Sequence, residues 1–234
     1  MKKIILVLTL IVVSSCAELN QVVNQMPNPT LSNAQIAGGL KEALQNGITN
    51  QVSFLALKDG FYKNDLVKIP MPSELQNLEN TLRKVGLGKL ADDGIKMLNR
   101  AAEDAVKEAT PIFVNAIKSL TVTDAKNILL GNQNAATDFL QNATKTALFA
   151  KFEPVIKNSF AEVGADVIWS NLITKYNAIP LTRNVNPDLT NYVTSQALNS
   201  VFKMVAKEEL KIRTDIKSRT SKILQDVFKL QDRF

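Results

Sequence analysis

Carboxylates, guanidinium groups and amides that could do chemistry gather at three places along the chain. In the first, Asn99, Arg100 and Glu103 fall within two turns of a predicted helix. Carboxylates can do acid–base work where burial separates their pKa values. Glu103 is therefore a candidate catalytic residue, and Asn99 and Arg100 are candidate binding residues. The structural alternative is that these side chains fix the packing of helices.

The second group centres on Asp124. Asn127 lies about one turn further along a predicted helix, and Gly131 and Thr137 follow close behind in the sequence. Asp124 is the candidate catalytic carboxylate of this group. Its structural alternative is a helix start, because Thr123 and Asp124 are residue types that are typical of the first turn of a helix.

The third group consists of Glu208, Glu209, Arg213 and Arg219. Glu208 is a candidate catalytic residue, and Arg213 and Arg219 are candidate binding residues. Adjacent side chains on a helix point about 100° apart, so Glu208 and Glu209 do not easily share a proton. Glu209 and Arg213 are four residues apart, which is the spacing of a structural ion pair. We expect structural roles in all three groups ahead of catalytic ones.

The composition excludes the commonest catalytic designs. The chain has no His, and Cys16 is its only Cys. Ser–His and Cys–His catalysis are therefore excluded, as are zinc, iron–sulfur and thiol-nucleophile sites once Cys16 is used elsewhere. Residues 92–94, Asp-Asp-Gly, lack the spaced carboxylates of a calcium-binding loop. We expect no metal and no cofactor, and an enzyme here would have to work without His.

The first sixteen residues predict an export signal. Lys2 and Lys3 precede an uncharged apolar run at residues 4–13, and two small residues then lead to Cys16. The apolar run is too short to span a bilayer as a helix, which needs about 20 residues. The end of the signal resembles a bacterial lipoprotein box, which implies cleavage before Cys16 and lipid attached to it. The alternatives are an ordinary secretory signal with a chance Cys, or a buried thiol.

These features divide the chain into a signal peptide at residues 1–15, a lipidated Cys with a flexible tether at residues 16–31, and a helical domain at residues 32–234. Lipoproteins retained in the inner membrane commonly carry Asp after the Cys, and here Ala17 follows it. The resemblance therefore implies the outer membrane, and we expect the domain to face the periplasm. The expected partners are the membrane, through the lipid, and an unidentified protein or apolar ligand.

The formal net charge is +6, and residues 203–234 hold nine basic and five acidic side chains. Such an excess can bind nucleic acid or an anionic surface. Here, however, the acidic residues are interleaved with the basic ones along the sequence. That pattern favours a solvated helix face, and we expect no nucleic-acid partner.

Apolar residues recur with the period of a helix through most of the chain. Ser32 is a candidate N-cap, and Ile36, Leu40, Leu44 and Ile48 follow every four residues. No sustained alternation of apolar and polar residues predicts a strand. The sequence therefore predicts an all-α fold, a single domain resembling a multi-helix bundle.

Several local features refine this prediction. Gly38 and Gly39 either weaken the first helix or let another helix approach closely. Residues 61–72 carry two prolines and read as an extended loop packed on the core. Pro111 is predicted to lie in the first turn of a new helix. Residues 135–151 are predicted as a helix, and Pro154 is predicted to begin a separate segment.

Four stretches together resemble an uncharacterised bacterial family of exported, all-helical proteins, known as domain of unknown function 4197. These stretches are Ile69–Pro72, Met97–Ala105, Asp124–Phe139 and Glu208–Phe228. The family pattern leads us to expect a Pro soon after Arg213, where this chain has Thr214, Asp215 and Ile216. The resemblance implies a helical fold and export, and it implies no activity.

Three functional hypotheses remain from the sequence. The first is a lipid-anchored cell-envelope protein of unknown activity that acts as a binding or structural module. The second is a carrier that holds an apolar ligand in a cavity between its helices. The third is a His-independent enzyme that uses carboxylates and Arg. We expect a binding or structural role ahead of catalysis.

Overall fold

The computed structural model describes residues 31–233, except for residues 85, 163, 165, 166, 168, 171, 172, 175, 176 and 179–187. The signal peptide, Cys16 and all but the last residue of the tether therefore lie outside the described residues. Within the described residues, the regular structure is entirely helical. The predicted all-α fold is confirmed.

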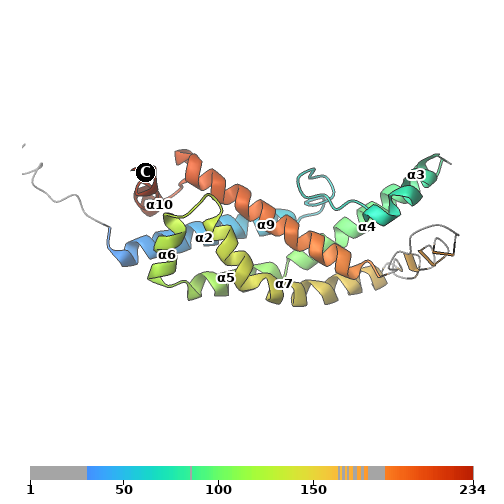
Figure 1. The fold of residues 1–234 in the computed structure, drawn as a ribbon, viewed down its shortest axis with the longest axis horizontal. Coiled ribbons are helices and arrows are strands. Elements are labelled where there is room, and N and C mark those ends of the chain that lie inside the picture. Colours follow the sequence, from blue (N-terminus) through green and yellow to red (C-terminus); the bar gives the residue numbers. More distant parts are fainter. Residues whose placement is uncertain are drawn as a thin grey trace, which may run out of the picture.

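The longer helices, in chain order, are α2 (Asn33–Leu55), α3 (Gln76–Lys84), α4 (Gly88–Val106), α5 (Ala109–Ser119), α6 (Val122–Leu129), α7 (Ala135–Glu162), α9 (Thr190–Thr214) and α10 (Lys222–Phe228). Short 3₁₀ turns occur at η1 (Ser73–Leu75), η2 (Ile216–Ser218) and η3 (Gln231–Arg233). They form an elongated bundle in which α7 and α9 run side by side (Figure 1). The first turn of α2 and α10 lie at one end, and α3 lies at the other (Figure 1).

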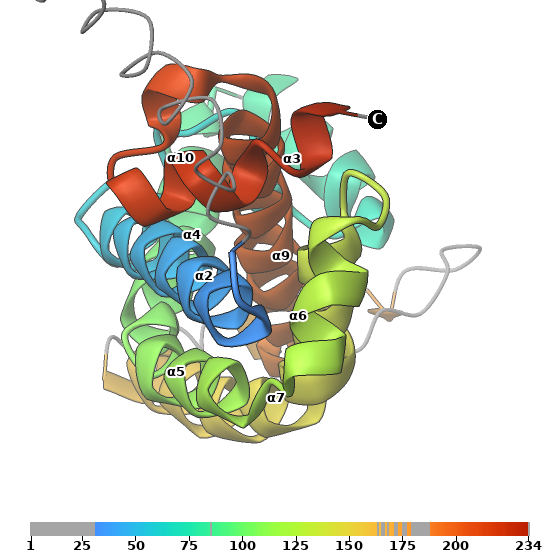
Figure 2. The same ribbon diagram turned by 90° about the vertical axis from the view of Figure 1, so that its left-hand side faces the viewer.

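Helix α2 begins where the sequence predicts. The Ser32 hydroxyl accepts a hydrogen bond from the Gln35 amide, and the Gln35 side chain accepts one from the Ser32 amide, which completes a capping box. The predicted apolar stripe, Ile36, Leu40, Leu44 and Ile48, is buried. Viewed end-on, α2 is surrounded by α5, α6, α9 and α10 (Figure 2), and it contacts all four. This helix is the centre of that end of the bundle.

The two adjacent glycines of α2 differ in their surroundings. Gly39 is buried, and a Cβ atom placed there would lie 2.7 Å from Cγ2 of Val227 on α10. Gly38 is exposed, and a Cβ atom there would have no neighbour within 4 Å. Of the two explanations that the sequence offers, close approach of another helix therefore applies to Gly39.

Helix α7 corrects one prediction, because it runs through Pro154 without a break. Proline lacks the N–H that would bond the carbonyl of Ala150, four residues earlier. Both Ala150 and Pro154 are exposed, so the missing bond lies on the solvent side of the helix. On the opposite side Phe152 and Ile156 are fully buried. Burial of this face holds the helix together across the proline.

Candidate functional site

The Asn99 group clamps a loop and forms no open site. Asn99 is fully buried on α4, where its Oδ1 accepts a hydrogen bond of 2.8 Å from the Ile69 amide. Its Nδ2 donates to the carbonyl oxygens of Ile69 at 2.8 Å and Ile95 at 2.7 Å. The amide thus satisfies both backbone groups of Ile69 in a segment with no strand to pair with. Residues 56–72, which connect α2 to η1, are called the clamped loop below.

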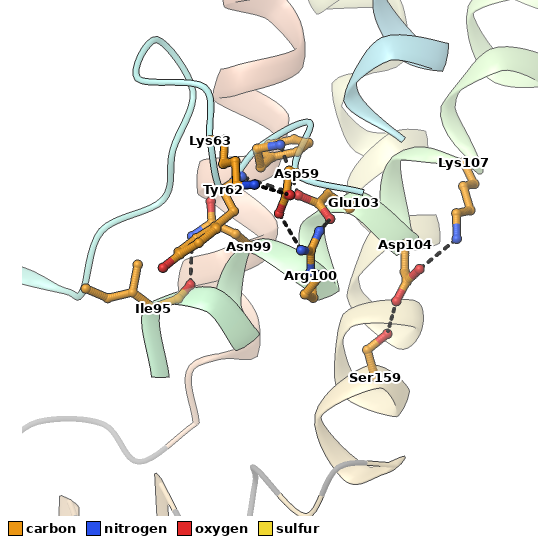
Figure 3. Close-up of polar contacts among 11 residues, drawn as sticks. Asp59, Tyr62, Lys63, Ile95, Asn99, Arg100, Glu103, Asp104, Lys107 and Ser159 are labelled. Atoms are coloured by element: carbon orange, nitrogen blue, oxygen red, sulfur yellow. Dashed lines mark hydrogen bonds and ion pairs between the residues drawn. The ribbon is translucent and has the colours of Figure 1, made fainter. Parts of the chain in front are cut away.

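Glu103 and Arg100 hold the first half of the clamped loop. The buried Oε1 of Glu103 accepts hydrogen bonds from the amides of Phe61 at 3.1 Å and Tyr62 at 3.3 Å. Arg100 donates one nitrogen to Glu103 and another to Asp59, so that the three side chains point toward one another (Figure 3). The side chains of α4 therefore hold the clamped loop at two places, around residues 59–62 and at Ile69.

Asp59 is a member of this cluster that the sequence reading missed. Its φ of 71° lies in the left-handed region, which non-glycine residues seldom adopt. Lys63 pairs with its carboxylate at 3.0 Å, and this contact, together with Arg100, holds the pKa of Asp59 below its ordinary value. The Asp59-Gly60 dipeptide is a turn signal in the sequence and could have identified the position.

The Glu209 group also serves the backbone. Glu209 and Arg213 form the predicted ion pair, at 2.7 Å, with both side chains almost completely buried. Glu209 accepts hydrogen bonds from the amides of Ala136 at 3.0 Å and Thr137 at 2.8 Å, and from the Thr137 hydroxyl at 2.7 Å. These amides belong to the first turn of α7, whose N–H groups have no partner inside the helix.

Arg213 makes the matching contacts at the end of the preceding helix. Its guanidinium donates to the carbonyl oxygens of Ile128 at 2.8 Å and Leu129 at 3.1 Å, in the last turn of α6. An acidic group thus faces the positive end of α7 and a basic group faces the negative end of α6, as the helix dipoles favour. The pair joins α6 and α7 to α9.

Arg219 closes the end of α9. It donates to the carbonyl oxygens of Ile212 at 3.0 Å and Arg213 at 2.9 Å, and to the carboxylate of Asp232. The hydrogen bond from Arg219 lowers the pKa of Asp232. The turn that departs from the family pattern is built by Asp215, which accepts from the Lys217 amide and the Ser218 hydroxyl, both at 2.9 Å.

The Asp124 group does not assemble as the sequence suggests. Asp124 accepts hydrogen bonds from the amide of Thr121 at 2.9 Å and from its hydroxyl at 2.7 Å, in the capping box of α6. These two bonds lower the pKa of Asp124. The helix start predicted here is confirmed: α6 begins at Val122, and Thr121 is its N-cap. Asn127 is exposed, and Thr137 contacts Glu209 instead.

Glu208, the last candidate carboxylate, points away from its neighbour Glu209. Its Oε2 accepts a hydrogen bond of 2.9 Å from the side chain of Gln51 on α2. Within the described residues, no buried side-chain nitrogen or oxygen lacks a hydrogen-bond partner. In the same part of the chain, no group of three acidic or thiol side chains is placed to hold a metal ion. The candidate residues therefore serve separate structural contacts and do not converge on one site.

Three comparisons with known proteins bear on this arrangement. A family model described as "Protein of unknown function (DUF4197)" matches residues 30–229. Neither the curated proteins nor the solved structures yield a match to the chain. The matched region includes every residue of the clamp on α4 and the Glu209–Arg213 pair.

Proposed function

The chain belongs to this family of unknown function, and we propose that it is a lipid-anchored cell-envelope protein whose helical domain acts by binding and not by catalysis. The observation that carries the binding role is the clamp on α4. Three polar side chains that could have done chemistry are used to fix the backbone of one loop. A loop fixed on a rigid scaffold is a common way to present a binding surface.

The clamped loop carries apolar side chains that lie outside the core and are exposed to solvent. Leu57 is 61% exposed and Leu66 is 45% exposed, and Phe54, just before the loop, is also exposed. Val67, Ile69 and Met71 of the same segment are buried, so the loop has one side in the core and one in solvent. Exposed apolar side chains on an ordered loop support a role in contact with a partner.

The proposal of a lipid anchor rests on the sequence. Lys2, Lys3, the short apolar run and the small residues before Cys16 support export and lipid attachment. Several acyl chains together give firm membrane attachment, at about 0.8 kcal/mol for each buried CH₂ group. No helix among the described residues is both long and apolar enough to cross a membrane. We place the domain on the periplasmic side of the outer membrane.

The enzyme alternative needs carboxylates that converge on one cleft. Each candidate instead has its own structural partner: Glu103 holds the clamped loop, Asp124 caps α6, and Glu208 bonds Gln51. Substrate would have to displace these contacts to reach the carboxylates. This arrangement favours binding over catalysis.

The carrier alternative predicts a closed cavity lined by Phe, Ile and Leu. A depression of about 510 Å³ lies between the last turns of α7 and the start of α9. Phe160, Trp169 and Leu189 line it, together with the charged side chains of Lys157 and Asp188. Among the described residues this depression is open and of mixed polarity, so the exposed loop is the better-supported binding feature.

Detergent phase partition tests the anchor. In Triton X-114, the wild-type protein from membranes should enter the detergent phase, and the Cys16→Ser protein should enter the aqueous phase. A Cys16→Ser protein that still partitions with detergent would contradict the lipid anchor.

Photo-crosslinking from the clamped loop tests the binding role. A photoreactive amino acid at Leu57 or Leu66 should give crosslinked products in intact cells. The matched control is Leu130, which is 58% exposed beyond the end of α6. Products of equal yield from all three positions would contradict a binding surface on the clamped loop.

A further inference from the structure

Three lysines of α9 share one exposed face. Lys203, Lys207 and Lys211 recur every four residues and are all exposed. Residues at this spacing are rotated by about 40° from one another, and the three span about 12 Å along the helix. We call Lys203, Lys207, Leu210 and Lys211 the lysine face. Helix α9 passes beside the clamped loop (Figure 1), and Lys203 on α9 donates a hydrogen bond to a carbonyl oxygen of this loop.

The acidic residues that are interleaved with these lysines in the sequence leave this face in the structure. Glu209 is buried against Arg213 and the first turn of α7. Glu208 points toward Gln51 on α2. Asp215, beyond the last lysine, accepts hydrogen bonds from Ser218 and Lys217 that lower its pKa, and the charge of Lys211 contributes to the same shift, so that Asp215 borders the end of this face. Helical geometry therefore separates Glu208 and Glu209 from the lysines with which the sequence mixes them.

The three lysines lack a close carboxylate partner among the described residues. Among the ion pairs of the described residues, none within 4 Å involves Lys203, Lys207 or Lys211. The Lys203 ammonium donates to the carbonyl oxygen of Leu66 at 2.8 Å, which brings the clamped loop to the end of the face. Asp138 of α7 flanks Lys203 across a shallow depression.

Apolar side chains accompany the charges. Leu210 is 41% exposed between Lys207 and Lys211, and Leu66 is exposed beside Lys203. Lysines with interspersed exposed leucines are typical of surfaces that lie in the headgroup region of a membrane. A small soluble anion would need no such apolar groups.

We propose that the lysine face lies against anionic phospholipid headgroups. The inference rests on the proposed function, because a lipid on Cys16 would hold the domain beside a membrane and raise the effective concentration of headgroups. Each lysine near an anionic surface then adds a modest attraction, so that three give on the order of a 100-fold gain in affinity. The clamped loop, with Leu66, would lie at the same surface.

Vesicle binding by the chain without its lipid tests this assignment separately from the anchor. The described buried hydrophobic residues lie between Ile36 and Phe228, so a chain from Ala17 to Phe234 keeps that core. Its helicity is checked by circular dichroism. We expect it to bind vesicles of phosphatidylglycerol and phosphatidylethanolamine, to lose binding between 50 and 500 mM salt, and to ignore phosphatidylcholine vesicles.

The variant Lys203→Glu/Lys207→Glu/Lys211→Glu should bind these vesicles at least about 100-fold more weakly. The matched control is Lys145→Glu/Lys151→Glu/Lys157→Glu on α7. Those lysines are also exposed, but six-residue spacing places them about 120° apart around their helix. The control has the same net charge and should change affinity by no more than a few-fold.

Three outcomes would overturn the proposal. One is a wild-type chain that does not bind anionic vesicles. Another is an equal loss of affinity in the two triple variants, because net charge and not the lysine face would then govern binding. The third is binding to soluble polyglutamate as tight as to vesicles, which would assign the face to an acidic macromolecule. None of these outcomes would alter the phase-partition result for Cys16.

Discussion

Glu209 and Arg213 form a buried ion pair of 2.7 Å that connects the end of α6 to the start of α7. The carboxylate accepts hydrogen bonds from two amides in the first turn of α7, and the guanidinium donates hydrogen bonds to two carbonyl oxygens in the last turn of α6. These two charged residues, which the sequence presents as part of a candidate site, thus connect α6, α7 and α9. Buried charges of this kind are retained at a desolvation cost, and removing only one of them leaves the other unpaired.

We predict that Glu209→Gln and Arg213→Met each lower the free energy of unfolding by about 3–5 kcal/mol. The double variant Glu209→Gln/Arg213→Met should lose less than the sum of the two single losses, because neither charge is then left alone. Urea denaturation at pH 7 measures all three. Glu208→Gln is the control and should change stability by less than about 1 kcal/mol. Additive losses would contradict the coupling.

Asn99→Ala should release the second half of the clamped loop. The substitution leaves both backbone groups of Ile69 without a partner, at a cost of about 1–3 kcal/mol. Hydrogen exchange should become faster at Ile69 and its neighbours by more than the change in global stability explains. Asp104→Asn is a control on the same helix, where Asp104 contacts the exposed Lys107 and Ser159 (Figure 3). Equal effects of the two substitutions on exchange in the loop would contradict the clamp.

Adjacent glycines in α2 should respond to alanine in opposite ways. Gly38→Ala adds a Cβ atom in open space and should stabilise the helix by about 0.5–1 kcal/mol. Gly39→Ala pushes against Val227 and Ile223 of α10 and should destabilise the protein by about 1–3 kcal/mol. Thermal unfolding of the two variants measures both. Stabilisation by both substitutions would show that α10 does not pack closely on Gly39.

The contact between Arg219 and Asp232 predicts a pH dependence. Arg219 lowers the pKa of Asp232 below its ordinary value of 3.8 in the folded chain. A carboxylate with a depressed pKa adds stability above its unfolded pKa, and that stability is lost as the pH falls through the folded pKa. Asp232→Asn should therefore be less stable than wild type at pH 7 and equally stable at a pH below the folded pKa. A difference in unfolding free energy that is the same at every pH would contradict the ion pair.

The sequence predicts most of the fold because its helices carry local signals. The predicted cap at Ser32 and the predicted burial of Ile36 and Leu40 depend only on residues within one or two helical turns. The structure confirms both predictions. The prediction that Pro154 begins a separate segment is wrong. Burial of Phe152 and Ile156 on the opposite side of the helix outweighs the local preference of proline for a helix start. The local signal that outweighs the proline is the recurrence of Leu148, Phe152, Ile156 and Phe160 every four residues, all of which are buried.

The sequence identifies which polar residues are buried in clusters less well than it identifies their types, because it does not show their hydrogen-bond partners. The spacing of Glu209 and Arg213 predicts their ion pair, since both lie on one helix. That Glu209 also receives the amides of Ala136 and Thr137, more than seventy residues earlier, depends on how α7 and α9 pack. The position of Glu208 and Glu209 off the lysine face follows, in contrast, from helical periodicity along α9. The packing of distant segments decides whether a polar side chain is catalytic, structural or exposed on the surface.

A lipid on Cys16 is the premise of both proposals, and the intact mass of the protein from its own membranes tests it most directly. The protein is extracted with detergent and measured by mass spectrometry without prior digestion. We predict a polypeptide that begins at Cys16, with the added mass of a diacylglyceryl group on sulfur and an acyl chain on the new amine. A polypeptide that begins elsewhere, or one with a free thiol at Cys16, would contradict the lipid anchor.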